Sequence, residues 1–298
     1  MAGTSSLPDP PVRMGLLAGW GDYPFVVADA LQQQGIEVVG VGIRGHVEPA
    51  LKEHCQVYRE LAIGRLGAAI RFMKHHRVTA ATMAGKVHKA ELFRPGAWGK
   101  LLPDWEALRA FGSHWITGTG DRRDDTLIMA AVDAFARHGI QFAPATDFVP
   151  ELLVEEGVLV GRLSRWQRMD IEFGWQHAKQ LGGLDIGQTV VVKRKAVLAV
   201  EAIEGTDRCI ERAGELCPSG DFTVVKVAKP KQDMRFDVPT IGIGTMRQIA
   251  EAGGRVLAVE ADRTILIDKA ATLDFARRHR ITLVACRADQ YACSARAA

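Results

Sequence analysis

The stretch that decides the fold is Met14–Gly35, which reads MGLLAGWGDYPFVVADALQQQG. Its apolar run Met14–Ala18 predicts a short buried strand, and the glycines that follow predict a tight turn. Apolar residues then recur at helical spacing over Phe25–Gln34, and the stretch ends at Gly35, a residue type that often terminates helices. A strand, a turn and a helix in succession are the opening unit of a parallel sheet.

The same alternation continues through the first half of the chain. Ile36–Ile43 and Thr79–Met83 predict two further buried strands, and Arg65–His76 and Asp124–His138 have the spacing of helices. Strands that alternate with helices are typical of a parallel sheet with helices on both faces. The predicted fold class is therefore α/β, with a Rossmann-like N-terminal domain over residues 14–150.

The second half of the chain begins with a predicted antiparallel hairpin, Thr189–Val192 followed by Ala196–Ile203. Helices are predicted at Thr206–Leu216, Thr245–Ala252 and Asp268–His279, and strands at Thr223–Ala228 and Ile281–Cys286. Two further elements are predicted at Val256–Val259 and Thr264–Ile267. Thr206 is the expected N-cap of its helix. We predict a mixed α/β C-terminal domain over residues 160–288, a disordered arm at 1–13 and a tail at 289–298.

Length and charge set the class of protein. The 298 residues agree with two domains of about 150 residues each. A net charge of +3 is too small for nucleic acid to be the expected partner. No apolar run approaches the ~18 residues needed to span a bilayer, and the first residues do not resemble a secretion signal. Five cysteines without CxxC spacing fit buried thiols in a reducing compartment. The expected location is cytoplasmic.

The turn after the first strand carries Gly19 and Gly21. Because it opens a helix, its backbone N–H groups and the helix dipole favour an anion. The spacing is not GxGxxG, and no acidic residue follows about 20 residues later, so a dinucleotide site is poorly matched. A phosphate-binding turn and a turn without a ligand both remain open.

Carboxylates gather at the start of the Asp124–His138 helix, where Asp124 and Asp125 stand in the first turn. The simpler explanation is that they offset the helix dipole. They could instead hold a metal ion or a ribose hydroxyl.

The densest chemistry lies between Lys226 and Gly244, where four cations and two carboxylates occupy twelve residues. Val238 precedes a proline and is therefore extended, which places Asp237 on a stiff segment. Lysine and arginine neutralise phosphate oxygens, and an aspartate can hold a divalent cation or orient water. A solvated charged loop would have the same composition.

Polar residues also flank the predicted hairpin. Asp185–Gln188 precedes it and Glu201–Asp207 follows it, so the two groups could face a common cleft. A turn and a helix start would also account for Glu204, Thr206 and Asp207. GxSxG and HExxH motifs are missing from the sequence, which leaves hydrolysis by an activated water as the simplest enzymatic interpretation.

Three of these segments carry a family resemblance. Asp185–Gln188, Ala199–Asp207 (AVEAIEGTD) and Lys226–Gly242 (KVAKPKQDMRFDVPTIG) resemble the UDP-2,3-diacylglucosamine pyrophosphatases of the LpxI type. The opening GLLAGWGDYP and the Asp124–Asp125 pair resemble the N-terminal motifs of that family. The resemblance covers nearly the whole chain.

The resemblance implies Mg²⁺-dependent hydrolysis of the diphosphate of UDP-2,3-diacylglucosamine to UMP and 2,3-diacylglucosamine 1-phosphate (lipid X), in lipid A biosynthesis. Asp237 would be the catalytic and metal-binding aspartate, with Lys226 and Arg235 as further catalytic residues. The expected substrate-binding residues are Gly19, Gly21, Asp124, Asp125, Gln188, Glu204, Thr206, Asp207, Lys229, Gln232 and Thr240.

A lipid substrate also implies apolar contacts. A predicted loop rich in glycine and proline carries six large apolar residues, Leu92, Phe93, Trp98, Leu101, Leu102 and Trp105. They could line an acyl tunnel, touch the membrane surface or pack on their own core. Peripheral contact with the inner face of the cytoplasmic membrane is expected, and a homodimer is left open. Two alternative functions are a Rossmann-type nucleotide-binding oxidoreductase and a lipid or sugar-nucleotide carrier without catalysis.

Overall fold

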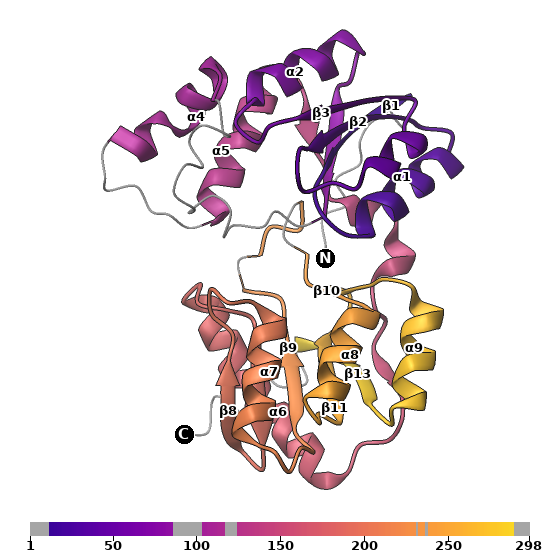
Figure 1. Cartoon of the computed structure of the whole chain (residues 1–298), viewed down its shortest axis with the longest axis vertical. Helices are drawn as coiled ribbons and strands as arrows, with labels where there is room; N and C mark the ends of the chain where they lie inside the picture. The colour runs from indigo at the N-terminus through magenta and orange to yellow at the C-terminus, as the bar shows by residue number, and fades with distance from the viewer. Residues whose placement is uncertain (1–11, 86–102, 117–123, 231, 236–237, 289–298) are drawn as a thin grey trace. The chain divides into compact units, whose positions relative to one another are not determined.

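The computed structural model describes residues 12–85, 103–116, 124–230, 232–235 and 238–288, with side chains over the same ranges except 112–116 and 124–127. The chain divides into two compact units (Figure 1). Unit 1 comprises Met1–Val149 and Met234–Phe236, and unit 2 comprises Pro150–Asp233 and Asp237–Ala298. The chain therefore passes from unit 2 to unit 1 and back around Met234–Phe236.

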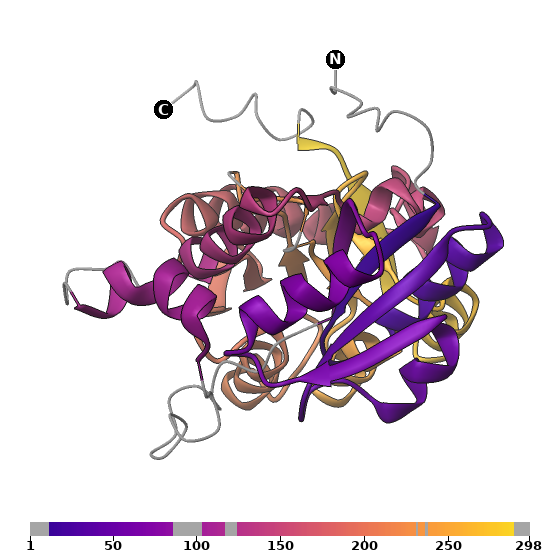
Figure 2. The same ribbon diagram turned by 90° about the horizontal axis from the view of Figure 1, so that it is seen from above.

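Unit 1 is built on a parallel sheet with the strand order β3-β2-β1-β4-β5. Its strands are β1 (Arg13–Ala18), β2 (Glu37–Ile43), β3 (Val57–Leu61), β4 (Ala80–Ala84) and β5 (Gln141–Phe142). The order reverses between β1 and β4, as it does in Rossmann folds. Figure 2 shows β1, β2 and β3 running side by side. The predicted parallel sheet is confirmed.

Helices cover both faces of this sheet. They are α1 (Tyr23–Gln33), α2 (Leu66–His75), α4 (Trp105–Ile116) and α5 (Asp124–Arg137), with short 3₁₀ turns η1 (Pro49–His54) and η3 (Ala145–Asp147). One core joins α2, α4 and α5 to the strands through Ile70, Ala107 and Phe135. Leu17 packs on that core, whereas its neighbour Leu16 is buried on the other face, where α1 lies against β1 and β2.

Unit 2 is built on a mixed sheet with the strand order β6-β13-β11-β9-β7-β8. Its strands are β6 (Gly157–Val160), β7 (Thr189–Lys193), β8 (Ala196–Val200), β9 (Thr223–Lys226), β11 (Val256–Glu260) and β13 (Thr282–Cys286), and a separate pair joins β10 (Thr240–Ile241) to β12 (Ile265–Leu266). Strands β9, β11 and β13 are parallel, and the predicted hairpin β7–β8 is antiparallel. The predicted mixed α/β architecture is confirmed.

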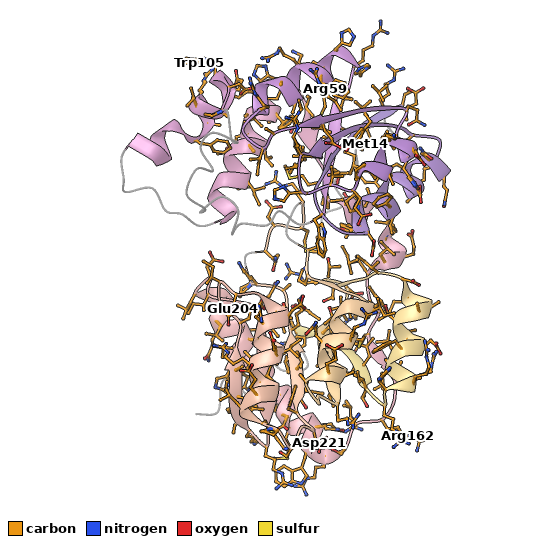
Figure 3. All side chains as sticks on the ribbon, in the orientation of Figure 1. Met14, Arg59, Trp105, Arg162, Glu204 and Asp221 are labelled. Carbon is orange, nitrogen blue, oxygen red and sulfur yellow. The ribbon has the colours of Figure 1, made fainter. Side chains whose placement is uncertain are left out.

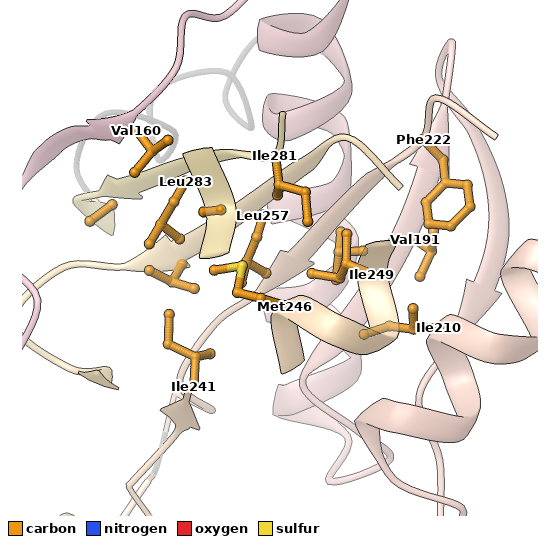
Figure 4. Close-up of a cluster of buried hydrophobic side chains, with 14 of the residues drawn as sticks. Val160, Val191, Ile210, Phe222, Ile241, Met246, Ile249, Leu257, Ile281 and Leu283 are labelled. Carbon is orange, nitrogen blue, oxygen red and sulfur yellow. The ribbon is translucent and has the colours of Figure 1, made fainter. Parts of the chain in front are cut away.

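Two helical layers enclose this sheet. Helix α6 (Arg165–Gly183) packs on one face through Ile171 and Trp175. The other face carries α7 (Thr206–Leu216), α8 (Ile243–Glu251) and α9 (Lys269–Arg278), and a 3₁₀ turn η4 (Pro150–Leu152) opens the unit. Figure 4 shows side chains of the core on this face, to which Ile210, Met246 and Leu257 belong. Burial at about 25 cal/mol per Å² of apolar surface makes these two cores the main stabilising contribution.

In unit 2, one predicted N-cap and one predicted helix start are wrong. Thr206 is the first residue of α7 and not its N-cap, because Gly205 takes the cap position with φ of 85°. Helix α8 begins at Ile243, two residues before the predicted Thr245, since Gly242 is its N-cap. Both caps are glycines without a side chain to accept a hydrogen bond, so the usual sequence signal is missing at these two starts.

Candidate functional site at the carboxyl edge of the unit 2 sheet

Three charged residues of unit 2 lie where its strands end. Lys226 is the last residue of β9, Glu260 is the last residue of β11, and Glu201 follows β8 directly. Because β7 runs antiparallel to both β8 and β9, all three positions lie at one edge of the sheet. Figure 3 places Glu204 at this end of the unit, opposite Asp221 and Arg162. Ligands of open α/β sheets bind outside the carboxyl ends of the strands, so this edge is the candidate site.

Lys226 holds a buried position at the centre of the edge. Its side chain is buried, and its Nζ donates a hydrogen bond to the Thr240 carbonyl oxygen at 3.1 Å. The Thr240 hydroxyl in turn donates to the Val238 carbonyl oxygen at 3.0 Å. Two residues predicted to act on the substrate, Lys226 and Thr240, are thereby brought together.

On the other side of Thr189 from Lys226 lies a carboxylate that the predicted site did not include. Glu201 is buried, and its Oε1 accepts a hydrogen bond from the Thr206 hydroxyl at 3.1 Å. The hydroxyls of Thr206 and Thr189 are 3.4 Å apart, and Thr189 stands opposite Lys226 in the β7–β9 ladder. The predicted binding residue Thr206 therefore orients this carboxylate.

Close packing holds the end of β8 in place. A Cβ on Gly187 would collide with the Glu201 carbonyl group, so only glycine fits where the two chain segments approach. The Glu201 carboxylate also acts electrostatically on the thiol of Cys209 in α7. Burial, with the Glu201 carboxylate as the next cause, raises the pKa of that thiol to about 12.

The segment after β9 is fixed by contacts of its own. Lys229 Nζ donates to the Asp185 carboxylate at 2.6 Å. The Lys229 backbone N–H donates to the Gln232 side-chain carbonyl at 2.6 Å, and Gln232 is buried. Lys229 and Gln232, both predicted to bind substrate, thus help to hold the segment that leads toward Asp237.

An ion pair between the partly buried Lys179 and the buried Glu260 anchors the same segment. Lys179 of α6 donates to Glu260 Oε2 at 2.6 Å and to the Ala228 carbonyl at 2.8 Å. Glu260 Oε2 also accepts from the Ala228 backbone N–H at 2.8 Å. Burial lowers the pKa of Lys179, while the neighbouring Glu260 carboxylate opposes that shift. Neither Lys179 nor Glu260 was predicted from the sequence to belong to the site.

The remaining predicted residues of unit 2 surround this edge. Glu204 accepts a hydrogen bond from Arg212 at 2.8 Å, and Asp207 is exposed in the first turn of α7. The Gln188 backbone carbonyl accepts from the Val227 N–H, and its side-chain Oε1 is buried with no hydrogen-bond partner among the described residues. Gln188 precedes Thr189 in an extended segment and therefore points to the opposite face of the sheet.

The predicted glycine turn of unit 1 lies at the reversal of its strand order. The Gly19 N–H donates to the Ala84 carbonyl at 2.9 Å, which joins the loops after β1 and β4. Gly21 has φ of 101° and Gly85 has φ of 94°. Both loops sit at carboxyl ends of adjacent strands, beside the start of α1, where an anion is favoured.

Arg235 belongs to the three-residue segment that joins unit 1, where its Nη2 lies 3.2 Å from the Met129 sulfur of α5. Asp237 lies outside the described residues, as do the side chains of Asp124 and Asp125, whose backbones begin α5. Within the described ranges, no group of three His, Cys, Asp or Glu side chains could hold a metal ion. None of the described helices is long and apolar enough to cross a membrane.

Comparison with known proteins places the chain in a family. Residues 13–152 match the LpxI N-terminal domain and residues 155–284 match the LpxI C-terminal domain. The chain belongs to the LpxI family. UDP-2,3-diacylglucosamine pyrophosphatase LpxI of Caulobacter vibrioides is 28% identical over 270 residues, which cover 88% of this chain and 92% of that relative. The resemblance inferred from the sequence is confirmed.

Solved structures resemble this LpxI-family chain only weakly. Biotin carboxylase from Campylobacter jejuni, in a β,γ-ATP complex, aligns with 10% identity and a TM-score of 0.23, over 69% of this chain and 42% of that one. The biotin carboxylase domain of Hydrogenobacter thermophilus 2-oxoglutarate carboxylase gives 13% identity and a TM-score of 0.23, over 69% and 41%. The chain spans less than half the length of either structure.

Proposed function

We propose that this chain hydrolyses the diphosphate of UDP-2,3-diacylglucosamine and releases UMP and 2,3-diacylglucosamine 1-phosphate. The observation that carries the proposal is the match to both LpxI domains, together with the name of the Caulobacter relative. The carboxyl edge of the unit 2 sheet supports it, because Lys226 supplies a buried cation there.

Hydrolysis of the diphosphate requires its negative charge to be neutralised. Its phosphates are negative and repel an incoming water until their charge is balanced. Lys226 is held by the Thr240 carbonyl in a buried place, where a fixed cation acts more strongly on a developing oxyanion than it does in water. Arg235 is predicted to add positive charge to the phosphates as well.

Magnesium dependence belongs to the same proposal and rests on the family resemblance and on Asp237. The described side chains do not form a set of three metal ligands, so they do not by themselves make a metal centre. Asp237 is proposed to hold Mg²⁺, a hard cation that prefers carboxylate oxygens and water.

The test is a reaction of purified protein with UDP-2,3-diacylglucosamine in ¹⁸O-labelled water, followed by mass spectrometry of both products. We expect UMP and lipid X, one ¹⁸O in only one of them, and loss of the reaction in EDTA that added Mg²⁺ restores. Substrate bound without UMP release would instead support the carrier, and a thermal shift with NAD or NADP would support the oxidoreductase.

We also propose that the protein works at the inner face of the cytoplasmic membrane, where an acylated substrate is held. The support is an exposed face of α4, on which Trp105 is 75% exposed and Leu108 is 41% exposed, with Arg109 beside them. Residues three and four apart share one side of a helix. Tryptophan and leucine next to a cation suit peripheral contact with an anionic bilayer.

Co-sedimentation with phosphatidylglycerol-containing vesicles tests this contact. The double variant Trp105→Ala/Leu108→Ala is expected to bind several-fold less, because two apolar anchors are removed from the lipid boundary. Trp166→Ala is the matched control, since Trp166 is 57% exposed but lies on α6 of unit 2. Equal binding by the double variant and the wild type would rule out this face.

A further inference from the structure

We propose that Glu201 accepts a hydrogen bond from a sugar hydroxyl of the bound substrate. The inference deepens the proposed function and rests on it, because it takes the substrate to be a sugar nucleotide. Glu201 lies in the AVEAIEGTD segment but is not one of the residues that the sequence predicted to bind.

The first observation is a carboxylate oxygen with no partner. Glu201 is 8% exposed, and its Oε2 is buried with no hydrogen-bond partner among the described residues. A buried polar atom without a partner costs free energy, and the cost is larger for a charged group. An ionised carboxylate accepts hydrogen bonds and donates none, so Oε2 calls for a donor or a cation.

The second observation is that this carboxylate is held in one orientation. Oε1 accepts from the Thr206 hydroxyl at 3.1 Å, and Thr206 also approaches Thr189 Oγ1 at 3.4 Å. The Glu201 backbone N–H donates to the Thr189 carbonyl at 2.9 Å. With the backbone and one oxygen fixed, Oε2 is a preorganised acceptor.

The third observation is the position of Glu201 at the carboxyl edge. In nucleotide-binding sheets, an acidic residue at a strand end accepts a hydrogen bond from ribose, while phosphates lie near helix starts and cations. Here Glu201 follows β8, and Lys226 is on the same face of the sheet, one strand beyond Thr189. A substrate with a phosphate near Lys226 and a hydroxyl at Glu201 would give Oε2 the hydrogen-bond donor that it lacks among the described residues.

A hydroxyl is favoured over a metal ion at this carboxylate. Metal centres need several ligands, and no described group of three His, Cys, Asp or Glu side chains includes Glu201. Its described hydrogen-bond partner is a threonine hydroxyl, which already donates to Oε1. A sugar nucleotide presents hydroxyls on its ribose and on its glucosamine, and the experiment separates these two sources.

Binding of small ligands in metal-free buffer tests the proposal without hydrolysis. Isothermal titration calorimetry would compare UMP with 2′-deoxy-UMP and 3′-deoxy-UMP, and glucosamine 1-phosphate with its 4-deoxy and 6-deoxy forms. The proteins are the wild type, Glu201→Met, Glu201→Gln, and Glu215→Gln as a control on the exposed end of α7. Thermal unfolding of each variant reports whether it is folded.

If the ribose is the donor, the wild type should bind UMP about tenfold more tightly than one deoxy analogue, as expected for a hydrogen bond to a charged group. Glu201→Met should lose this preference, Glu201→Gln should keep part of it, and Glu215→Gln all of it. The same pattern confined to the glucosamine ligands would support the proposal with that sugar as the source.

If Glu201 has only a structural role, its substitution would weaken the binding of each ligand and of its deoxy analogue equally. The ratio of the two affinities would then be unchanged. That result overturns the proposal, as does a wild type that binds none of these ligands or shows no hydroxyl preference. Should the hydroxyl preference be present while UDP-2,3-diacylglucosamine is not hydrolysed, the proposed reaction fails and the Glu201 site stands.

Discussion

Asp237→Ala is expected to lower turnover of UDP-2,3-diacylglucosamine by about a thousandfold while leaving a folded protein. Removing a single group that stabilises developing charge costs roughly 10²–10³ in rate, and a ligand of a catalytic cation is at the upper end. The expectation comes from the family resemblance, which places the family's catalytic aspartate at Asp237 in RFDVP over Arg235–Pro239. The measurement is kcat at saturating Mg²⁺, with product UMP quantified by chromatography.

The matched control for this variant is Asp274→Ala. Asp274 is an exposed aspartate of α9, paired with Arg278 on the same helix, so its removal should leave kcat unchanged. Thermal unfolding should show both variants folded. Turnover by Asp237→Ala within tenfold of the wild type would remove Asp237 from the reaction and with it the proposed magnesium ligand.

Lys179→Met is expected to destabilise the protein by about 3–5 kcal/mol, because it leaves the carboxylate of Glu260 buried without its cation. The side chain of Glu260 is 3% exposed, so solvent does little to replace the lost partner. Such a loss corresponds to a fall in Tm of roughly 6–20 °C for a domain of this size. Differential scanning calorimetry measures it.

Two further variants separate the buried pair from a surface one. Arg278→Met breaks the exposed pair with Asp274, where 66% and 58% of the side chains are accessible, and should change stability by less than about 1 kcal/mol. Lys179→Met combined with Glu260→Leu removes both charges and should recover much of the loss. A single Lys179→Met variant as stable as Arg278→Met would contradict the role given to this pair.

Periodicity and turn chemistry predicted most of the fold. The strand and helix predicted within Met14–Gly35 correspond to β1 and α1. The hairpin β7–β8 and helix α7 also lie where they were predicted. Strand β3 (Val57–Leu61) was missed because it is an edge strand without a fully buried side chain and has no apolar run. Helix α6 was missed although Ser164 and Gln167 form a capping box at its start.

The candidate site was predictable where its residues stand close together in the chain. Lys226 and Thr240 share one short segment, and the structure joins them by a hydrogen bond. The Lys179–Glu260 pair links positions 81 residues apart, which no local pattern connects. Glu201 was visible in its motif, but its unpartnered oxygen depends on how β8 and α7 meet.

The passage of Met234–Phe236 into unit 1 has a practical consequence for dissecting the molecule. Unit 1 is a discontinuous body, since its chain is interrupted by Pro150–Asp233. A gene fragment that stops at Val149 would omit the three residues that include Arg235 and its contact with Met129. A fragment that begins at Pro150 would carry the same three residues without their unit. Neither fragment therefore corresponds to a complete unit. To express unit 1 alone, Met234–Phe236 would have to be joined to the fragment that ends at Val149.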